Sequence, residues 1–499
     1  MKKISKLLVA NRGEIALRVM RTAREMGIQT VAVFSEADRQ MPFVRYADEA
    51  VCIGPAASNQ SYLVIDKIIA AAKETGAEAI HPGYGFLSEN AAFSEAVEEA
   101  GLIFVGPSPY SINTMGSKIG AKQAAKAFGV PMVPGTDQPI KSTEEARKIA
   151  EVTGYPLLVK ASAGGGGKGM RVVEKPEELE EGIRLAQSEA ASAFGNDDVF
   201  MERYVANPKH IEIQILADKH GNCVYLFERE CSVQRRHQKL IEEAPSSCLT
   251  PDVRKAMGES AVAVAKACDY SGAGTVEFLV DDALNFYFLE MNTRLQVEHC
   301  VTEEITGLDL VKEQIRVAEG HPLPFRQEDL EIRGHAIELR VCAEDPANNF
   351  LPDTGALERY FTPKGPGIRV DDGYEEGSEI PIYYDPMIAK LIAWGATREQ
   401  AIERLLRAIE EYQIQGIQTT LPFGTWALNQ PAFREGKFDT SFIPNYFSPE
   451  KLYENSKEAP QIAALLAAHV WKKEGSVAPE TTGVENAETR SGWTQRRWQ

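Results

Sequence analysis

The stretch GTVEFLVDDALNFYFLEMN, residues 274–292, has the pattern of two β-strands joined by a tight turn. Runs rich in β-branched and aromatic residues flank the segment 281–285, whose Asp and Asn residues favour a turn. A turn centred in that segment places Glu277 opposite Glu290 on the neighbouring strand. Side chains in such a pair lie about 5 Å apart at Cβ, so two carboxylates repel each other unless a cation lies between them. A divalent cation is the simplest remedy.

The residues after this hairpin favour a functional site over an exposed acidic pair screened by solvent, which is the alternative. Asn292 continues the face of Glu290, and an oxygen-only set of ligands suits Mg²⁺ or Mn²⁺ held jointly with nucleotide phosphates. Polar Arg294, Gln296 and Glu298 then follow at every second position, so an extended chain keeps them on one side. The alternating run is longer than a usual strand, and a bend is expected partway.

A second segment, ASAGGGGKG at 161–169, follows a predicted strand that ends in Lys160. Four consecutive glycines let backbone N–H groups approach an anion without obstruction by Cβ atoms. The spacing is not that of a Walker A loop, which needs Gly, four residues and then Gly-Lys-Ser/Thr. The run therefore predicts a mobile lid over phosphates, with a plain flexible hairpin tip as the alternative. Lys160 supplies a phosphate-binding ammonium group.

The first 35 residues predict a βαβ unit. An apolar run at 7–10 is followed by a helical pattern that ends at Gly27, and the strand TVAVF occupies 30–34. Such a unit predicts that the chain opens with a parallel α/β domain. One glycine at the first turn is not the G-x-G-x-x-G pattern, which disfavours a dinucleotide site there.

The charged stretch 228–243 lacks helical amphipathicity and, taken alone, is best interpreted as a solvated charged face. Gln234, His237 and Lys239 gain interest only because other segments already indicate a nucleotide site. Near the end of the chain, 461–473 predicts an amphipathic helix, and the polar stretch after it predicts disorder. A frayed terminus is favoured over a tail that docks on a partner.

The composition is that of an ordinary globular protein of two to four domains, with 499 residues, 43% of them hydrophobic. The net charge of −18 argues against nucleic acid or an anionic membrane as the main partner. Arg12 and Glu14 interrupt the first apolar run too early for a signal peptide, so a cytoplasmic protein is expected. The seven cysteines are scattered without C-x-x-C spacing, which predicts free, mostly buried thiols rather than disulfides or a zinc site.

Four segments together resemble the biotin carboxylase family, whose members serve acetyl-CoA, propionyl-CoA or pyruvate carboxylases. They are ANRGEIA at 10–16, HPGYGFLSEN at 81–90, KASAGGGGKGMRVV at 160–173 and EMNTRLQVEH at 290–299. The resemblance implies an α/β and α+β fold: a pre-ATP-grasp parallel α/β domain over 1–115, an ATP-grasp domain over 116–333 with a mobile lid at about 132–203, and a strand-rich α+β cap over 334–447. The remaining 448–499 is expected to form a helical, then disordered tail.

The resemblance also implies roles for individual residues. ATP and its phosphates are expected to contact Lys118, Lys160, Gly165, Gly166, Gly167, Glu202, His210, Gln234, His237, Glu277 and Glu290. The metal, Mg²⁺ or Mn²⁺, is expected on Glu277, Glu290 and Asn292. Bicarbonate and biotin are expected to contact Lys239, Arg294, Gln296, Val297, Arg340 and Tyr84. Lys239, Arg294, Arg340 and Glu298 are the expected catalytic residues, with Glu298 as the base that deprotonates bicarbonate and Arg340 steadying the ureido oxyanion of biotin.

The implied reaction joins ATP, bicarbonate and the biotinyl group of a carrier protein through carboxyphosphate. No Met-Lys-Met biotinylation motif occurs in the sequence, so the carrier and the carboxyltransferase are expected to be other chains, and a homodimer is expected. Two residues depart from the family: Arg203 replaces a frequent Lys, and Cys300 replaces the usual Pro. The alternatives are another ATP-grasp ligase that makes an acyl phosphate for an amine, and a non-enzymatic assembly protein, which the intact charged residues disfavour.

Overall fold

The computed structural model describes residues 2–136, 138–161, 170–194, 197–452 and 459–474. Two compact units make up the chain, Met1–Pro449 and Glu450–Gln499. None of the helices in the described residues is long and apolar enough to cross a membrane.

A five-stranded parallel sheet opens the first unit, in the order β3-β2-β1-β4-β5. Its strands are β1 (Lys6–Val9), β2 (Gln29–Ser35), β3 (Glu49–Gly54), β4 (Ala79–His81) and β5 (Ile103–Phe104), and its helices include α1 (Gly13–Glu25), α2 (Pro42–Tyr46), α3 (Ile65–Thr75) and α4 (Ala91–Glu99). The predicted βαβ unit is confirmed, with β1 beside β2 and α1 between them. Gly27 follows α1 with a φ of 75°, a conformation that glycine adopts without strain.

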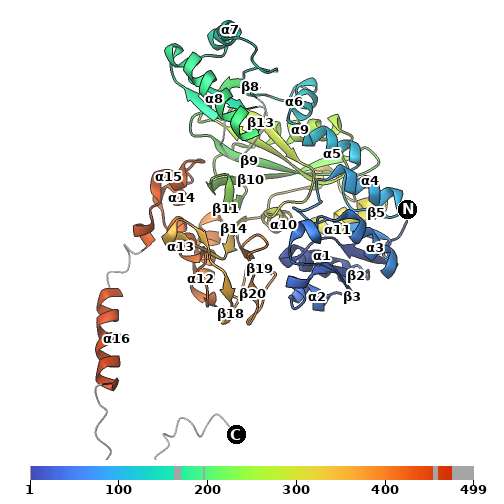
Figure 1. Ribbon diagram of the computed structural model, residues 1–499, viewed down its shortest axis with the longest axis vertical. Helices are drawn as coiled ribbons and strands as arrows, with labels where there is room; N and C mark the ends of the chain where they lie inside the picture. Colours follow the sequence, from blue (N-terminus) through green and yellow to red (C-terminus); the bar gives the residue numbers. More distant parts are fainter. Residues whose placement is uncertain (1, 137, 162–169, 195–196, 453–458, 475–499) are drawn as a thin grey trace, which may run out of the picture. The chain divides into compact units, whose positions relative to one another are not determined.

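An eight-stranded sheet forms the centre of the unit, in the order β13-β12-β9-β10-β11-β14-β21-β19, and all its pairings are antiparallel (Figure 1). The strands are β9 (Lys209–Ala217), β10 (Cys223–Arg235), β11 (Gln238–Ala244), β12 (Gly272–Val280), β13 (Phe286–Asn292), β14 (His335–Cys342), β19 (Ile368–Asp372) and β21 (Met387–Gly395). Because β11 pairs with β14, one sheet joins the ATP-grasp and cap segments inferred from the sequence.

Helices cover this sheet, and most begin at residues that cap their free N–H groups. The main ones are α5 (Pro109–Gly116), α6 (Lys118–Ala127), α9 (Pro251–Ala267), α10 (His299–Thr306), α11 (Leu310–Ala318), α12 (Arg398–Glu411) and α13 (Leu421–Leu428). Thr250 caps α9 and Thr397 caps α12, each accepting a backbone N–H three residues on. Beneath α9 the apolar face of β9, with Ile211, Ile213 and Ile215, forms a buried core. The opposite, polar face of β9 is thereby directed at the site.

A separate three-stranded sheet, in the order β7-β6-β8, lies with α7 and α8 at the top of Figure 1. Its elements are α7 (Thr143–Thr153), β6 (Leu157–Ala161), β7 (Met170–Val173), α8 (Leu179–Phe194) and β8 (Val199–Arg203). Leu157, Val159 and Val173 belong to its own core. The glycine run 162–169 lies outside the described residues, so the lid stays a prediction.

Short elements complete the first unit: β15 (Glu344–Asp345), β16 (Leu351–Pro352), β17 (Gly355–Ala356), β18 (Arg359–Phe361), β20 (Glu379–Ile380), β22 (Gln413–Gln415), α14 (Pro431–Arg434) and α15 (Phe442–Tyr446). In the second unit, α16 (Ala459–Glu474) includes the helix predicted at 461–473, and its side chains from 463 to 472 are exposed.

Candidate active site

The β12–β13 hairpin has the predicted register. Glu277 lies directly opposite Glu290, beside a shift in the ladder at Phe278. The two carboxylates differ in environment, because Glu277 is only 5% exposed whereas Glu290 is exposed to solvent. The strand ends at Asn292, which is the bend that the long alternating run required.

Glu277 is surrounded by hydrogen-bond donors. Its Oε2 lies 2.8 Å from Nε2 of His210, and its Oε1 lies 3.1 Å from Nζ of Lys239. Amide groups of Asn292 and Gln296 also donate to Oε1, at 2.9 and 2.8 Å. Burial opposes ionisation of Glu277, but Lys239 and His210 outweigh it and hold the pKa of the carboxyl below its usual range. Lys239 and His210 thus offset the negative charge of Glu277, a role that the sequence pattern alone predicted for a metal.

Lys239 is the centre of the cluster. Its Nζ lies 2.5 Å from Glu212, 3.1 Å from Glu277 and 2.6 Å from Glu298. These carboxylates come from β9, β12 and the segment before α10, while Lys239 comes from β11. Burial opposes the charged ammonium, yet the three carboxylates raise the pKa of Lys239 well above its usual value. A fixed positive charge therefore lies within a ring of acidic groups.

Glu298 contacts a second cation through its other oxygen. Nη2 of Arg340 lies 3.0 Å from Oε2, and Nε of Arg340 donates to Glu242 at 2.6 Å. Burial would raise the pKa of Glu298, but Lys239 and Arg340 lower it well below its usual range. Burial raises the pKa of Glu242 to about 7, against the attraction of Arg340. Glu298 is therefore ionised, and Glu242 titrates near neutral pH.

The residues around Glu298 also carry defined contacts. Arg294 donates to Glu89 at 2.8 Å and to the side-chain oxygen of Asn292 at 2.9 Å. The backbone carbonyl of Val297 accepts from Nζ of Lys390 at 3.2 Å. Together with Gln296, these contacts bring the side chains predicted for bicarbonate into one region.

The expected biotin residue Tyr84 lies in the loop after β4, and its hydroxyl donates to Glu14. Glu14 also lies 3.2 Å from the ammonium of Lys390, which is completely buried. Burial and the Glu14 carboxylate together raise the pKa of Tyr84 well above its usual value. Tyr84 is thus a neutral hydrogen-bond donor that is held in place.

The predicted ATP residues lie in more than one part of the unit. Glu202 on β8 binds Lys160 at 2.5 Å and also binds Lys122. His237 is exposed in the turn between β10 and β11, with a φ of 69°, and Gln234 pairs with Lys239 across that hairpin. The side chain of Lys118 and the glycines Gly165, Gly166 and Gly167 lie outside the described residues.

The prediction that 228–243 forms a solvated face is wrong. Its residues form the hairpin of β10 and β11 in the middle of the central sheet, where Glu228, Arg229 and Glu230 are buried. The pattern misled because paired cations and carboxylates from neighbouring strands replace water around these charges. One signal was available in β9, where His210, Glu212 and Gln214 alternate with isoleucines and indicate a polar strand face.

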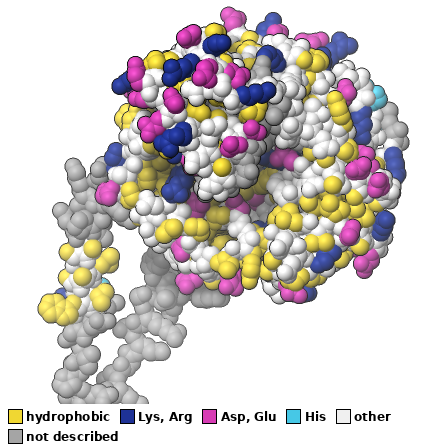
Figure 2. Space-filling view, turned by 45° about the horizontal axis from the view of Figure 1, so that its top comes forward, with side chains coloured by type: hydrophobic (Ala, Val, Ile, Leu, Met, Phe, Trp, Pro, Cys, Tyr) yellow, Lys and Arg dark blue, Asp and Glu magenta, His cyan; other side chains and the backbone are white. Residues whose placement is uncertain are grey.

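The face of the molecule in Figure 2 is hollowed near its centre, and acidic side chains are visible in the hollow. Apolar side chains lie around its lower border.

Comparisons with known proteins give one consistent result. Three family models match in order: "Biotin carboxylase, N-terminal domain" over residues 3–112, "Carbamoyl-phosphate synthase L chain, ATP binding domain" over 117–326, and "Biotin carboxylase C-terminal domain" over 338–445. Biotin carboxylase 1 of Bacillus subtilis is 53% identical over 444 residues, which are 89% of this chain and 99% of that protein. The chain belongs to the biotin carboxylase family.

Other relatives are components of named carboxylases. A pyruvate carboxylase subunit of Methanothermobacter thermautotrophicus is 54% identical over 442 residues, covering 89% of this chain and 90% of that protein. The propionyl-CoA carboxylase alpha chain of Ruegeria pomeroyi is 52% identical over 488 residues, covering 93% and 71%. The chain is therefore an ATP-dependent biotin carboxylase of the type found in biotin-dependent carboxylases.

Solved biotin carboxylases have the same fold. The biotin carboxylase domain dimer of the Hydrogenobacter thermophilus 2-oxoglutarate carboxylase, in complex with MgADP, ADP and bicarbonate, has a TM-score of 0.83 and 49% identity, covering 91% of this chain and 99% of that chain. A Campylobacter jejuni biotin carboxylase bound to a β,γ-ATP compound has a TM-score of 0.83 and 47% identity, covering 89% and 99%.

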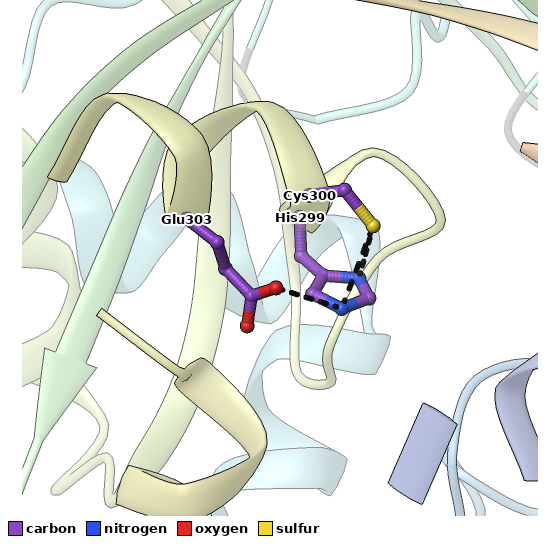
Figure 3. Close-up of side chains that lie close together, drawn as sticks. All are labelled: His299, Cys300 and Glu303. Carbon is purple, nitrogen blue, oxygen red and sulfur yellow. Dashed lines mark hydrogen bonds and ion pairs between the residues drawn. The ribbon is translucent and has the colours of Figure 1, made fainter. Parts of the chain in front are cut away.

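Two departures from the biotin carboxylase pattern lie at different places. Arg203 ends β8 with an exposed side chain. Cys300 lies in the first turn of α10 beside His299, with Glu303 one turn later (Figure 3). Its thiol is buried and lies 3.3 Å from Asp371, and burial raises its pKa well above the usual value. Cys300 therefore lies in the core, and α10 begins normally after Glu298.

The three side chains in Figure 3 do not form a metal site, although their ligand atoms lie close together. Glu303 already binds the guanidinium groups of Arg18 at 2.7 Å and Arg369 at 2.9 Å. These two cations, Arg18 buried and Arg369 partly buried, oppose a third positive charge beside the trio. These residues join α10 to α1 and β19 instead.

Proposed function

We propose that the cluster around Lys239 binds bicarbonate and that Glu298 accepts its proton as the γ-phosphoryl group of ATP is transferred. One observation carries this proposal: the carboxylate of Glu298 lies between Lys239 at 2.6 Å and Arg340 at 3.0 Å. Bicarbonate competes with Glu298 for the same cations. Its binding removes part of their stabilisation of the carboxylate and makes Glu298 a stronger base.

The proposed sequence of steps follows from the weak electrophilicity of bicarbonate. An oxygen of bicarbonate attacks the γ-phosphorus, ADP leaves, and the bicarbonate proton goes to Glu298, which gives carboxyphosphate. Carboxyphosphate then separates into CO₂ and phosphate beside biotin, whose N1′ loses its proton to the released phosphate and attacks CO₂. Arg340, held by Glu242 at 2.6 Å, stabilises the negative charge that develops on the ureido oxygen. Tyr84 lines the biotin side, and Val297 belongs with Lys239, Arg294 and Gln296 on the bicarbonate side.

Glu277, Glu290 and Asn292 present carboxylate and amide oxygens at one end of the β12–β13 hairpin, which fits Mg²⁺ and also Mn²⁺. Such a cation, when bound, offsets charge on the phosphate oxygens. Lys160 is the proposed phosphate contact from the smaller sheet, and Lys118, Gly165, Gly166 and Gly167 are the further proposed phosphate contacts. Glu202, which binds Lys160, is proposed to contact the adenosine. His210, Gln234 and His237 complete the proposed nucleotide contacts.

The proposed partners are a second copy of the chain, a biotin carrier protein and a carboxyltransferase subunit. A carrier on another chain is the proposed source of the biotinyl group. The dimer of the Hydrogenobacter thermophilus domain supports self-association. We propose the cytoplasm as the compartment, although relatives also include a chloroplastic biotin carboxylase from Populus trichocarpa. The final carboxyl acceptor depends on the transferase, and a pull-down of the biotinylated partner would identify it.

Phosphate release from MgATP tests the proposed chemistry. The expected result is release that depends on bicarbonate and is stimulated by free biotin. Phosphate release that is independent of bicarbonate but depends on an amine and a carboxylic acid would instead indicate an acyl-phosphate ligase and overturn the proposal.

A further inference from the structure

Arg229 lies beneath the proposed bicarbonate site without belonging to the predicted set of site residues. It is on β10, its side chain is 0% exposed, and it is among the largest completely buried side chains of the described residues. Its guanidinium group is directed toward the polar face of β9 and β12.

All five N–H groups of this guanidinium are used. Nε donates to Glu212 at 2.5 Å, Nη1 to Gln214 at 2.6 Å and to Thr302 at 2.9 Å, and Nη2 to Thr275 at 3.0 Å and to Gln296 at 2.8 Å. The acceptors come from β9, β12, α10 and the segment before α10. A planar fork with every donor paired has one orientation, so Arg229 is a rigid joint between these four elements.

The contact with Gln296 decides which way its amide points. Because its Oε1 accepts from Arg229, its Nε2 must point the other way, and it donates to Glu277 at 2.8 Å. A reversed amide would place an NH₂ group against the guanidinium and an oxygen against a carboxylate. Arg229 therefore sets the donor end of Gln296 at the site.

The contact with Glu212 decides how Lys239 is held. Arg229 takes Oε1 of Glu212, and Oε2 remains for Nζ of Lys239 at 2.5 Å. Without the guanidinium, Glu212 would carry an excess of buried negative charge beside Lys239 and would bind the ammonium more strongly. The cation would then be less available to an anionic substrate.

We propose that Arg229 is a positioning residue for bicarbonate. It orients Gln296 and weakens the ion pair between Glu212 and Lys239, without contacting the substrate. This inference depends on the proposed function of the cluster. Arg229 should therefore affect the binding of bicarbonate but not the binding of ATP. Within the described residues, no hydrogen bond joins Arg229 to Lys160, Glu202 or His210.

The test is steady-state phosphate release by the full chain carrying Arg229→Lys, with bicarbonate and MgATP varied separately. Lysine keeps the charge but lacks the planar fork, so it cannot hold Gln296 and Glu212 together. The expected result is a rise of at least about tenfold in the bicarbonate KM, with the ATP KM within about twofold of wild type. A purely structural role would lower activity at all substrate concentrations or move both KM values equally.

Two further variants keep the test decisive. Thr302→Val removes one acceptor of the guanidinium without changing the size of the buried side chain, and should raise the bicarbonate KM by about threefold even if Arg229→Lys does not fold. The matched control is Arg254→Lys. The guanidinium of Arg254 lies 2.7 Å from the carboxylate of buried Glu228, and this pair is away from the cluster. The control variant should leave the ratio of the two KM values unchanged.

The outcomes separate this inference from the proposed function. If the wild-type chain lacks bicarbonate-dependent phosphate release, the proposed function itself fails. If the wild type is active while Arg229→Lys or, should that variant not fold, Thr302→Val leaves the bicarbonate KM unchanged, the role of Arg229 is overturned. An equal change of both KM values in these variants also overturns it.

Discussion

Glu298 lies at the point where the charged residues of the site converge, and its two oxygens contact different cations. Lys239 holds one and Arg340 the other. The pKa of Glu298 is consequently far below that of an ordinary carboxyl, despite its burial. An ionised carboxylate is ready to accept a proton, and substrate binding rather than pH sets how strongly it does so.

Glu298→Gln should remove the base while preserving the size of the side chain. We expect bicarbonate-dependent phosphate release to fall by about a hundredfold or more, the usual contribution of a general base. Binding of MgATP should be retained, because Glu298 is hydrogen-bonded to Lys239 and Arg340 and, among the described residues, to none of the proposed nucleotide contacts. Isothermal titration with a non-hydrolysable ATP analogue and the phosphate assay measure the two effects, and wild-type turnover in the variant would exclude the role.

Sequence patterns identified the residues that alternate along β13 and beyond, but not those that support them. Glu277 and Glu290 follow from the hairpin, Glu298 follows from the alternation after it, and its role as the base follows from the resemblance. Arg229 and Glu242 were missed because a buried charge becomes plausible only when its partners on other strands are known. Glu212 was detectable, because polar and apolar residues alternate along β9.

At the scale of elements, the hairpin of β12 and β13 provides the proposed metal ligands. Glu290→Gln should weaken binding of the metal–nucleotide complex, because one of the carboxylates facing the cation loses its charge. The Mg²⁺ concentration needed for half-maximal phosphate release should rise several-fold. Asp282→Asn, an exposed acidic residue in the turn of the same hairpin, is the control. An unchanged Mg²⁺ requirement in Glu290→Gln would contradict the assignment.

The pair of β11 and β14 sets Glu242 opposite Glu338. Glu338 is completely buried, and neither of its oxygens has a hydrogen-bond partner among the described residues. Burial and the neighbouring Glu242 raise the pKa of Glu338 well above its usual value. A raised pKa in the folded state favours folding below the unfolded pKa of about 4.3, and this contribution is lost as pH rises toward the folded value.

Glu338→Gln should therefore stabilise the chain most at alkaline pH. We expect the Tm difference between variant and wild type to become more positive between pH 5.5 and pH 8.5, because only the wild type must keep a buried carboxyl neutral. Differential scanning calorimetry at the two pH values measures this difference. A constant or decreasing difference would contradict the raised pKa of Glu338.

At the scale of the whole molecule, the long sheet explains why the cluster is assembled from distant segments. Strands from Lys209 to Gly395 share it, so Lys239 on β11 lies close to Arg340 on β14 and to Glu277 on β12. The parallel opening domain could be predicted from its βαβ pattern. The mixed strand order could not, because local periodicity says nothing about which strands pair across a hundred residues.

The central claim is that this sheet brings a base and two cations to bicarbonate so that its carbon reaches biotin. The most direct measurement is transfer of labelled carbon from bicarbonate to free biotin in the presence of MgATP. We predict acid-labile labelled biotin that forms only with ATP, is lost in Glu298→Gln and does not exceed the phosphate released. ATP hydrolysis by the wild type, stimulated by bicarbonate but with no label on biotin, would contradict the account.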